Sequence, residues 1–255
     1  MAASSALANV HHHGGYSYVS KGLELEHKSL ARHIVDCPKG THVYGGGISA
    51  KAAFKKLYQV QSYPVDTKDA NKDPDDGWGV LVDNSGKKKL KARIYAVCGE
   101  TNPTYQKTHE NLGPHQLTQE VDSHCMTNVV GGGVRGSKGV GMEDGGPLNS
   151  STWYSYSQND SAKSGSFNQY VICASLPTTY SEVGGQSTPM SQIADRASCS
   201  SGYSVLSGGS SSTGAVRITT SAPFGTYKGW LFRGDFFGNF QGTQNALAVC
   251  AANQH

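Results

Sequence analysis

Short stretches of alternating apolar and polar residues, separated by turn residues, run along the first third of the chain. Trp78, Val80 and Val82 fall on one face of an extended segment, and Tyr95 and Val97 fall on one face of another. The run "DNSGKK" between them is typical of a turn. Period-two alternation rich in Val, Ile, Tyr and Trp predicts β-strands. The four predicted strands lie near Val43–Ser49, Leu57–Pro64, Trp78–Asn84 and Leu90–Cys98.

The same pattern recurs twice further along the chain, which indicates an internal repeat. A tryptophan stands twenty residues before a cysteine in each of three pairs: Trp78 and Cys98, Trp153 and Cys173, and Trp230 and Cys250. Each unit opens with another cysteine and a glycine-rich strand, which reads "HVYGGGIS", "NVVGGGVR" or "SVLSGGSS". A proline then precedes each tryptophan, at Pro64, Pro147 and Pro223. We predict three homologous units at about residues 31–100, 118–175 and 192–251 of one domain, 31–255.

The six cysteines, two in each unit, indicate a disulfide framework rather than six buried thiols. Among the possible pairings the repeat selects Cys37–Cys98, Cys125–Cys173 and Cys199–Cys250. Each bridge closes a loop of roughly 50–60 residues, which adds about 4 kcal/mol of stability in the chain-entropy model. Frameworks of this kind are typical of secreted, extracellular proteins.

A bridge between the opening and closing cysteines constrains the strand order. In a simple meander the first and fourth strands lie about 14 Å apart, whereas a disulfide joins Cα atoms about 4.4–6.8 Å apart. We therefore expect the fourth strand beside the first, in the Greek-key order 4-1-2-3. The predicted fold is all-β: a β-prism of three four-stranded Greek-key sheets with pseudo-threefold symmetry and one disulfide per sheet. The three tryptophans would anchor its common core.

The glycine triplets are expected to allow a close approach of backbone, or a bulge, near the axis of the prism. No Gly-Lys-Ser/Thr follows any of them, so a phosphate-cradling loop is not predicted. We expect no cofactor.

Composition changes this picture little. Hydrophobic residues make up 36% of the 255-residue chain and charged residues 16%, with 32 glycines, which suits short strands and many turns. The net charge of +3 gives no reason to expect a nucleic-acid partner. No apolar run approaches the ~20 residues of a membrane span. The sequence does not indicate an oligomeric state.

Residues 1–30 are expected to hold an N-terminal tail and a first strand region. Ala6-Leu7-Ala8 resembles the end of a secretory signal, and a plain disordered tail is the alternative. His11–His13 follow, and we expect them in a mobile terminus rather than at a metal site.

The order of these markers resembles that of vitelline membrane outer layer protein I. The resemblance rests on Cys-Pro-x-Gly at Cys37–Gly40, a glycine-ending strand, a proline and a closing cysteine, repeated over roughly residues 34–251. The unit is also similar to Cys-Pro-x-Gly…Gly-Gly-Gly repeats of secreted actinobacterial proteins. Cys125-Met126 and Cys199-Ser200 depart from the first motif. The resemblance implies a secreted β-prism that associates with extracellular matrix or carbohydrate, with no catalytic residues to carry over.

Catalytic motifs are few. The sequence contains neither Gly-x-Ser-x-Gly nor His-Glu-x-x-His. Histidine beside tyrosine, with a cation to neutralise a carboxylate, is the set that β-elimination of an acidic polysaccharide requires. Arg32 is the candidate cation, and surface histidines without a catalytic role are the default reading. The candidate acid–base residues are His33, His42, Tyr44, His109, His115 and His124.

Two further segments are candidate binding sites. The aromatic run at 227–240 provides a candidate sugar-stacking platform, or else packs across the prism ends. Its candidate ligand-binding residues are Tyr227, Phe232, Phe236 and Phe237. Asp69, Asn71 and Asp73 alternate as calcium ligands do, with an exposed polar loop as the main alternative.

These observations favour a secreted, disulfide-stabilised protein that binds an extracellular glycan or cell-envelope polymer. The alternatives are an extracellular polysaccharide-degrading enzyme, either a lyase or a glycoside hydrolase, and a secreted toxin, inhibitor or assembly component that contacts proteins. The units share core markers but differ in their loops, which favours one site over three equal ones.

Overall fold

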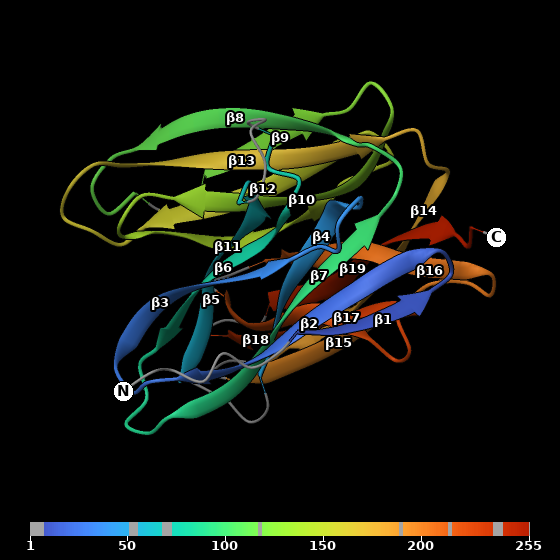
Figure 1. The fold of residues 1–255 in the computed structure, drawn as a ribbon. Coiled ribbons are helices and arrows are strands. Elements are labelled where there is room, and N and C mark those ends of the chain that lie inside the picture. Colours follow the sequence, from blue (N-terminus) through green and yellow to red (C-terminus); the bar gives the residue numbers. More distant parts are fainter. Residues whose placement is uncertain are drawn as a thin grey trace.

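The structure is a computed structural model, and it describes residues 8–50, 56–67, 73–116, 119–188, 191–213, 216–236 and 242–254. Within these ranges the chain forms nineteen strands and no helix (Figure 1). The strands make three antiparallel sheets, one of seven strands and two of six. No helix that could span a membrane occurs in the described part of the chain. The predicted all-β class is confirmed.

Each unit contributes six strands rather than the four predicted. Unit one contains β2 (Tyr16–Leu25), β3 (Ser29–Asp36), β4 (His42–Ala50), β5 (Leu57–Val65), β6 (Gly77–Asn84) and β7 (Leu90–Gly99). Unit two contains β8 (Thr104–Leu112), β9 (Gln119–His124), β10 (Asn128–Gly136), β11 (Val140–Pro147), β12 (Thr152–Asn159) and β13 (Gly165–Ala174). Unit three contains β14 (Thr178–Ser187), β15 (Gln192–Ser198), β16 (Tyr203–Ser212), β17 (Val216–Phe224), β18 (Gly229–Phe236) and β19 (Gly242–Ala252). One extra strand, β1 (Asn9–His13), precedes them.

The three sheets follow one rule, in which every sheet combines two units. Sheet A has the order β1-β2-β7-β4-β17-β18-β15, sheet B the order β3-β6-β5-β10-β13-β8, and sheet C the order β14-β19-β16-β11-β12-β9. In each sheet the glycine-rich strand and the closing-cysteine strand of one unit join the proline and tryptophan strands of another. Unit one shares sheet B with unit two, unit two shares sheet C with unit three, and unit three shares sheet A with unit one.

This exchange corrects the predicted four-stranded sheets. The closing strand does lie beside the opening strand, since Val43 pairs with Cys98. The strand that follows β4 along the chain, β5, does not join that sheet. It pairs with β10 of the next unit, through Ser62 and Val134. The order 4-1-2-3 is therefore present in space, but two different units build it.

The glycine triplets explain how the units join. A Cβ added to Gly47 would lie 1.9 Å from the carbonyl oxygen of Ser221, and one added to Gly133 would lie 2.1 Å from that of Ser62. Both distances are far below van der Waals contact, so a bare backbone is required where the neighbouring unit's strand enters. The predicted close approach is confirmed, at the junctions between units.

The middle glycine of each triplet makes room for the tryptophan of its own unit. A Cβ at Gly46 would lie 2.4 Å from the Trp78 ring, and a Cβ at Gly132 would lie 2.6 Å from the Trp153 ring. The three indoles are at most 2% exposed, which confirms their predicted place in the interior. Burial of such large rings is a main source of folding free energy.

All three predicted disulfides are present. The Cα atoms of Cys37 and Cys98 lie 5.9 Å apart, those of Cys125 and Cys173 lie 5.6 Å apart, and those of Cys199 and Cys250 lie 5.7 Å apart. One closing cysteine lies in each sheet, on β7, β13 and β19. The three bridges are consistent with an extracellular location.

The expected tail and linkers are largely strands. Residues 9–25 form β1 and β2, which belong to sheet A, so this region is part of the domain. His11–His13 lie in β1, paired with β2, and not in a mobile terminus. The segments between the units likewise supply β8, β9, β14 and β15, which pair with the closing or tryptophan strands. Residues 1–7, with most of the signal-like segment, lie outside the described residues.

Candidate functional site

A cleft of about 530 Å³ lies on sheet B and crosses the junction between units one and two. Strands β3, β5, β10, β13 and β8 all contribute to it. The side chains that give it its chemistry are two arginines, one lysine and three tyrosines. They are Arg32, Tyr63, Tyr105, Lys107, Arg135 and Tyr170.

Strand alternation brings these side chains to one face. The Nε1–H of Trp78 donates a hydrogen bond of 2.8 Å to Ser62 Oγ, so Ser62 faces the interior. Its neighbour Tyr63 therefore faces the opposite side. Val134 pairs with Ser62 and is fully buried, which turns the next residue, Arg135, to the same side as Tyr63. Residues of different units thus meet in one cleft because β5 and β10 share a sheet.

Two cations lie against one aromatic ring in the cleft. The guanidinium carbon of Arg32 lies 5.7 Å from the centroid of the Tyr63 ring, and that of Arg135 lies 5.4 Å from it. Both distances are within the range of cation–π attraction. Lys107 and Tyr170, which pair across β8 and β13, line the same cleft. Asp66 and Asp73 also line the cleft, and both have interaction partners of their own.

The hydroxyl of Tyr63 is buried and has no hydrogen-bond partner among the described residues. Burial raises the pKa of Tyr63, and the charges of Arg32 and Arg135 oppose that shift. Burial likewise raises the pKa of Tyr170, against the effect of Arg135. Both hydroxyls therefore stay protonated at neutral pH. The cleft offers positive charge and a hydroxyl donor, a combination that suits an anionic group.

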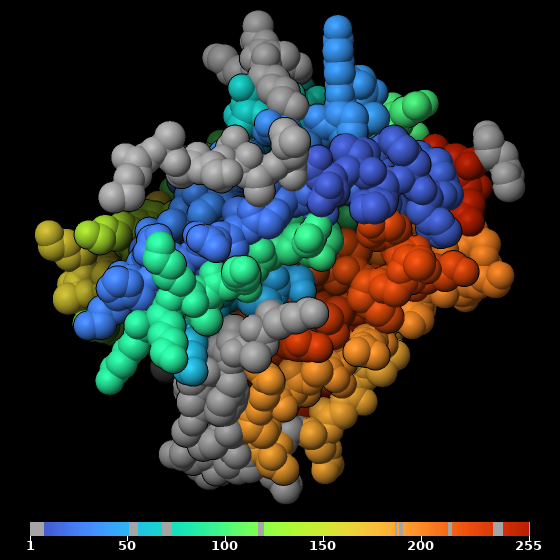
Figure 2. Space-filling model, turned by 60° about the horizontal axis from the view of Figure 1, so that its bottom comes forward, coloured from blue at the N-terminus to red at the C-terminus, as the bar shows by residue number. Residues whose placement is uncertain are grey.

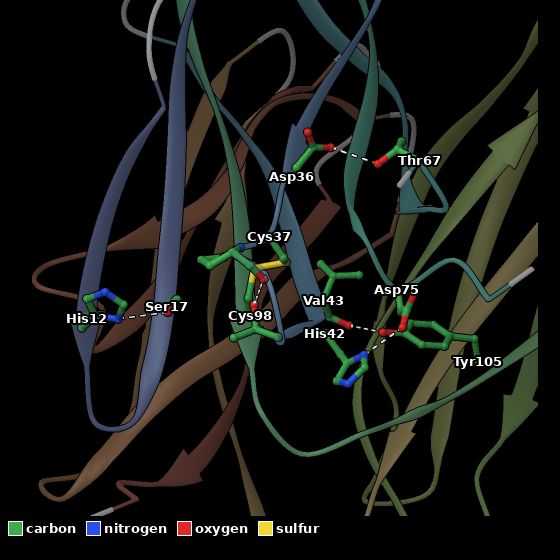
Figure 3. Close-up of a disulfide and its surroundings, with 12 residues drawn as sticks. His12, Ser17, Asp36, Cys37, His42, Val43, Thr67, Asp75, Cys98 and Tyr105 are labelled. Atoms are coloured by element: carbon green, nitrogen blue, oxygen red, sulfur yellow. Dashed lines mark hydrogen bonds and ion pairs between the residues drawn. A yellow bond between two sulfur atoms is a disulfide. The ribbon is translucent and has the colours of Figure 1, made fainter. Parts of the chain in front are cut away.

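A histidine–aspartate pair lies near the cleft beside Tyr105 (Figure 3). His42 Nδ1 and Asp75 Oδ2 are 2.8 Å apart. The Tyr105 hydroxyl donates to the carbonyl oxygen of Val43 at 2.8 Å, so it is already used within the fold. Burial raises the pKa of Tyr105, and the Asp75 charge adds to the effect. This group connects β4 to the loop before β6 and positions one wall of the cleft.

The six candidate acid–base residues do not converge. None of them lines the cleft. Tyr44 is fully buried and donates to the carbonyl oxygen of Thr101, which excludes it from surface chemistry. His33 is half-buried, and burial lowers its pKa. His109 contacts Asn168, His124 contacts Thr152, and His115 lies in the turn after β8.

The predicted aromatic platform is also not assembled. Phe232 is fully buried and Phe236 is 2% exposed, so both belong to the core, as the packing alternative required. Phe237 lies outside the described residues. Tyr227 stacks on Tyr18 with ring centroids 3.9 Å apart. Its ring also lies within 6.5 Å of the His11 and His13 rings of β1. Figure 2 shows the blue N-terminal strands at the surface beside the green β7 and the orange-red part of the chain.

The calcium candidates cannot be placed as a set, because Asp69 and Asn71 lie outside the described residues. Asp73 borders the sheet B cleft. Over the described ranges, no group of three or more His, Cys, Asp or Glu side chains is arranged to hold a metal ion.

A second cleft, of about 310 Å³, occupies the corresponding part of sheet C. Arg32 and Glu120 occupy equivalent positions in the two sheets. Each pairs with the residue that lies three positions after the tryptophan of its unit, Trp78 or Trp153. Lys107 and Glu182 are likewise equivalent. Each pairs with the residue that lies three positions before a closing cysteine, Cys173 or Cys250. Two basic residues of sheet B thus correspond to two acidic residues of sheet C.

Among the cleft residues, the sequence analysis named Arg32 as a candidate cation and Asp73 as a candidate calcium ligand. Tyr63, Lys107, Arg135 and Tyr170 could have been found by aligning the three units and comparing outward positions. To group these positions into one cleft, however, one must know that strands of units one and two share a sheet. The sequence repeat does not reveal this exchange of strands. No protein-family model matches the chain, and a search of curated proteins found no sequence significantly similar to it.

Proposed function

We propose that this is a secreted β-prism protein with pseudo-threefold symmetry that binds an acidic glycan or cell-envelope polymer in the sheet B cleft. The observation that carries the proposal is the convergence of Arg32 and Arg135 on the ring of Tyr63, in a cleft that also contains Lys107. Arginine forks bind carboxylate and sulfate oxygens through paired hydrogen bonds. The three disulfides support an extracellular setting for such a ligand.

Binding is favoured over polysaccharide cleavage by the contents of the cleft. A lyase needs a base that removes a proton from the sugar, within hydrogen-bond reach of it. Among the described lining residues there is no histidine, and the carboxylates of Asp66 and Asp73 already have interaction partners. Burial raises the pKa of Tyr63, which keeps its hydroxyl protonated. A protonated phenol and two guanidiniums hold an anion in place, whereas they do not readily accept a proton.

The test is calorimetric titration with polygalacturonate and with its fully methyl-esterified form. Esterification removes the negative charge and keeps the sugar chain. We expect binding of the acidic polymer only, weakened by salt because exposed charges are screened. The double variant Arg32→Gln/Arg135→Gln should lose about 100-fold in affinity, roughly one factor of ten for each charged contact.

Arg196→Gln is the matched control, because Arg196 also lies against an aromatic ring, 5.6 Å from the centroid of Phe224. It should bind as the native chain does. Equal affinity for the esterified polymer, or an unchanged affinity in the double variant, would overturn the proposal. Absorbance near 235 nm, from unsaturated products, would instead indicate a lyase.

A further inference from the structure

A smaller pocket, of about 170 Å³, lies where the proline-containing strands of the three units meet. Residues of β5, β11 and β17 line it, and these three strands contact one another directly. The pocket is separate from the sheet B cleft and shares none of its lining residues. It therefore depends on the closure of the whole three-unit fold, and we call it the axial pocket.

The axial pocket contains a buried amide without a partner. Gln59 is 2% exposed, and neither its Oε1 nor its Nε2 has a hydrogen-bond partner among the described residues. Gln61, on the other side of a β-bulge, is equally buried. Its Nε2 donates to the carbonyl oxygens of Gly136 and Val140, at 2.9 and 3.1 Å. A buried amide is normally satisfied, so the contrast marks Gln59 as the group that a ligand would complete.

The charged groups around Gln59 select the kind of ligand. The guanidinium carbon of Arg217 lies 5.0 Å from the Tyr58 ring centroid, and Arg217 also hydrogen-bonds Tyr58. Asp83, Glu143 and Asp160 line the same pocket, so three carboxyl groups face one guanidinium. The pocket therefore has an excess of acceptors and of negative charge, which favours a cationic ligand that donates hydrogen bonds.

The volume limits the size of this ligand. A water molecule needs about 10–15 Å³ of cavity volume of this kind, so the pocket has space for roughly a dozen waters. This is below the ~300–1,000 Å³ of sites for drug-sized molecules. One residue-sized molecule fits it, and a polymer chain does not.

We infer that the axial pocket binds a small hydroxylated amine. Its ammonium group would face Glu143 and Asp160, and its hydroxyl groups would pair with both atoms of the Gln59 amide. A hydroxyl both donates and accepts, so it satisfies the amide nitrogen and the amide oxygen together. This site is independent of the polymer cleft and holds whether or not the cleft binds a polyanion.

The test uses glucamine and sorbitol, which differ by one amine in place of one hydroxyl. The readouts are calorimetric affinity and chemical-shift changes of the amide groups that line the pocket. We expect glucamine to bind at least tenfold more tightly than sorbitol and to shift those resonances. Gln59→Leu and Glu143→Gln should each lower the affinity for glucamine about tenfold, and Arg32→Gln should leave it unchanged.

The two glutamines provide an internal control. Gln59→Leu removes an unpaired amide and should not lower the melting temperature, whereas Gln61→Leu removes two hydrogen bonds and should lower it clearly. Glu143→Gln tests the site without changing a core position. Equal binding of glucamine and sorbitol, no binding of either, or full affinity in both Gln59→Leu and Glu143→Gln would refute the inference.

Discussion

Sheets B and C are built by the same rule, yet their clefts carry opposite charges. Sheet B places Arg32 and Lys107 where sheet C places Glu120 and Glu182. The residues that define the fold are the same in both: a glycine at the junction, a buried tryptophan and a closing disulfide. The comparison teaches that the repeat constrains the interior positions and leaves outward positions free to carry different chemistry.

The two sheets also differ under their clefts. Asp144 of sheet C pairs with Tyr156, three residues after Trp153, and Gln61 of sheet B pairs with the residue three after Trp78. A buried carboxyl group in one sheet thus corresponds to a buried neutral amide in the other. Asp144 accepts hydrogen bonds from the Ser210 hydroxyl and from the backbone and hydroxyl of Ser212.

The largest effect is expected at the junction glycines. Gly133→Val in sheet B and Gly209→Val in sheet C each place a Cβ within about 2 Å of a neighbouring carbonyl oxygen. Such overlap cannot be relieved without separating two units, so each variant should lose more than about 4 kcal/mol and fail to fold stably. Denaturant unfolding measures this. Gly185→Ala is the control, since its Cβ would meet nothing within 4 Å. A junction variant of native stability would show that the units do not need this contact.

The next effect is a dependence of stability on pH that comes mainly from one buried carboxyl group of sheet C. Burial raises the pKa of Asp144 to about 7, despite its hydrogen bonds to the Ser210 and Ser212 groups. Between pH 4 and 7 the folded state therefore holds a proton that the unfolded state has released. The free energy of unfolding should fall as pH rises through this interval, by up to about 1.4 kcal/mol per pH unit from this group.

Urea unfolding at a series of pH values checks that slope. Asp144→Asn should flatten it, because the amide does not titrate, and Gln61→Glu should introduce a similar slope in sheet B. Native stability that stays constant or rises from pH 4 to 7, with no change on Asp144→Asn, would contradict the assignment.

A charge exchange tests the clefts directly. Arg32→Glu/Lys107→Glu gives sheet B the acidic residues of sheet C and should reduce polygalacturonate affinity about 100-fold, since two attractive contacts become repulsive. Glu120→Gln/Glu182→Gln changes only sheet C and should leave the affinity within about twofold. Titration at constant ionic strength measures both. If the sheet C variant lost affinity and the sheet B variant did not, the polymer site would lie on sheet C.

The smallest effect concerns the tryptophans. Trp78 donates to Ser62 Oγ, whereas Trp153 Nε1 has no partner among the described residues, because unit two has Gly145 at the place of that serine. Trp153→Phe should therefore cost about 1 kcal/mol less than Trp78→Phe, the value of one hydrogen bond. Trp230, which donates to Ser221 Oγ at 2.9 Å, serves as the second reference. Equal costs at all three positions would mean that the hydrogen bond adds nothing.

The local structure was predictable because it depends on short-range patterns. The strands around Trp78 and Cys98 follow from alternation, and the disulfides follow from the position of each cysteine within its unit. The strands β8 and β14 were missed, since their polar, exposed residues give no apolar alternation. The prediction of Phe232 and Phe236 as ligand contacts is wrong, because an aromatic run in a sequence does not show which side chains face inward.

The sequence by itself determined the strand class, the threefold repeat, the buried tryptophans and the three sulfur bridges, because each depends on residues within one unit. Tertiary structure alone decided which unit pairs with which. That choice brought Tyr63 of unit one beside Arg135 of unit two, and Gln59 to the meeting point of three strands. The reason is physical: hydrogen bonds between strands are the same whichever unit supplies them. The close approach at glycines such as Gly47 and Gly133 permits the neighbouring unit's strand to enter, and that contact exists only in the folded chain.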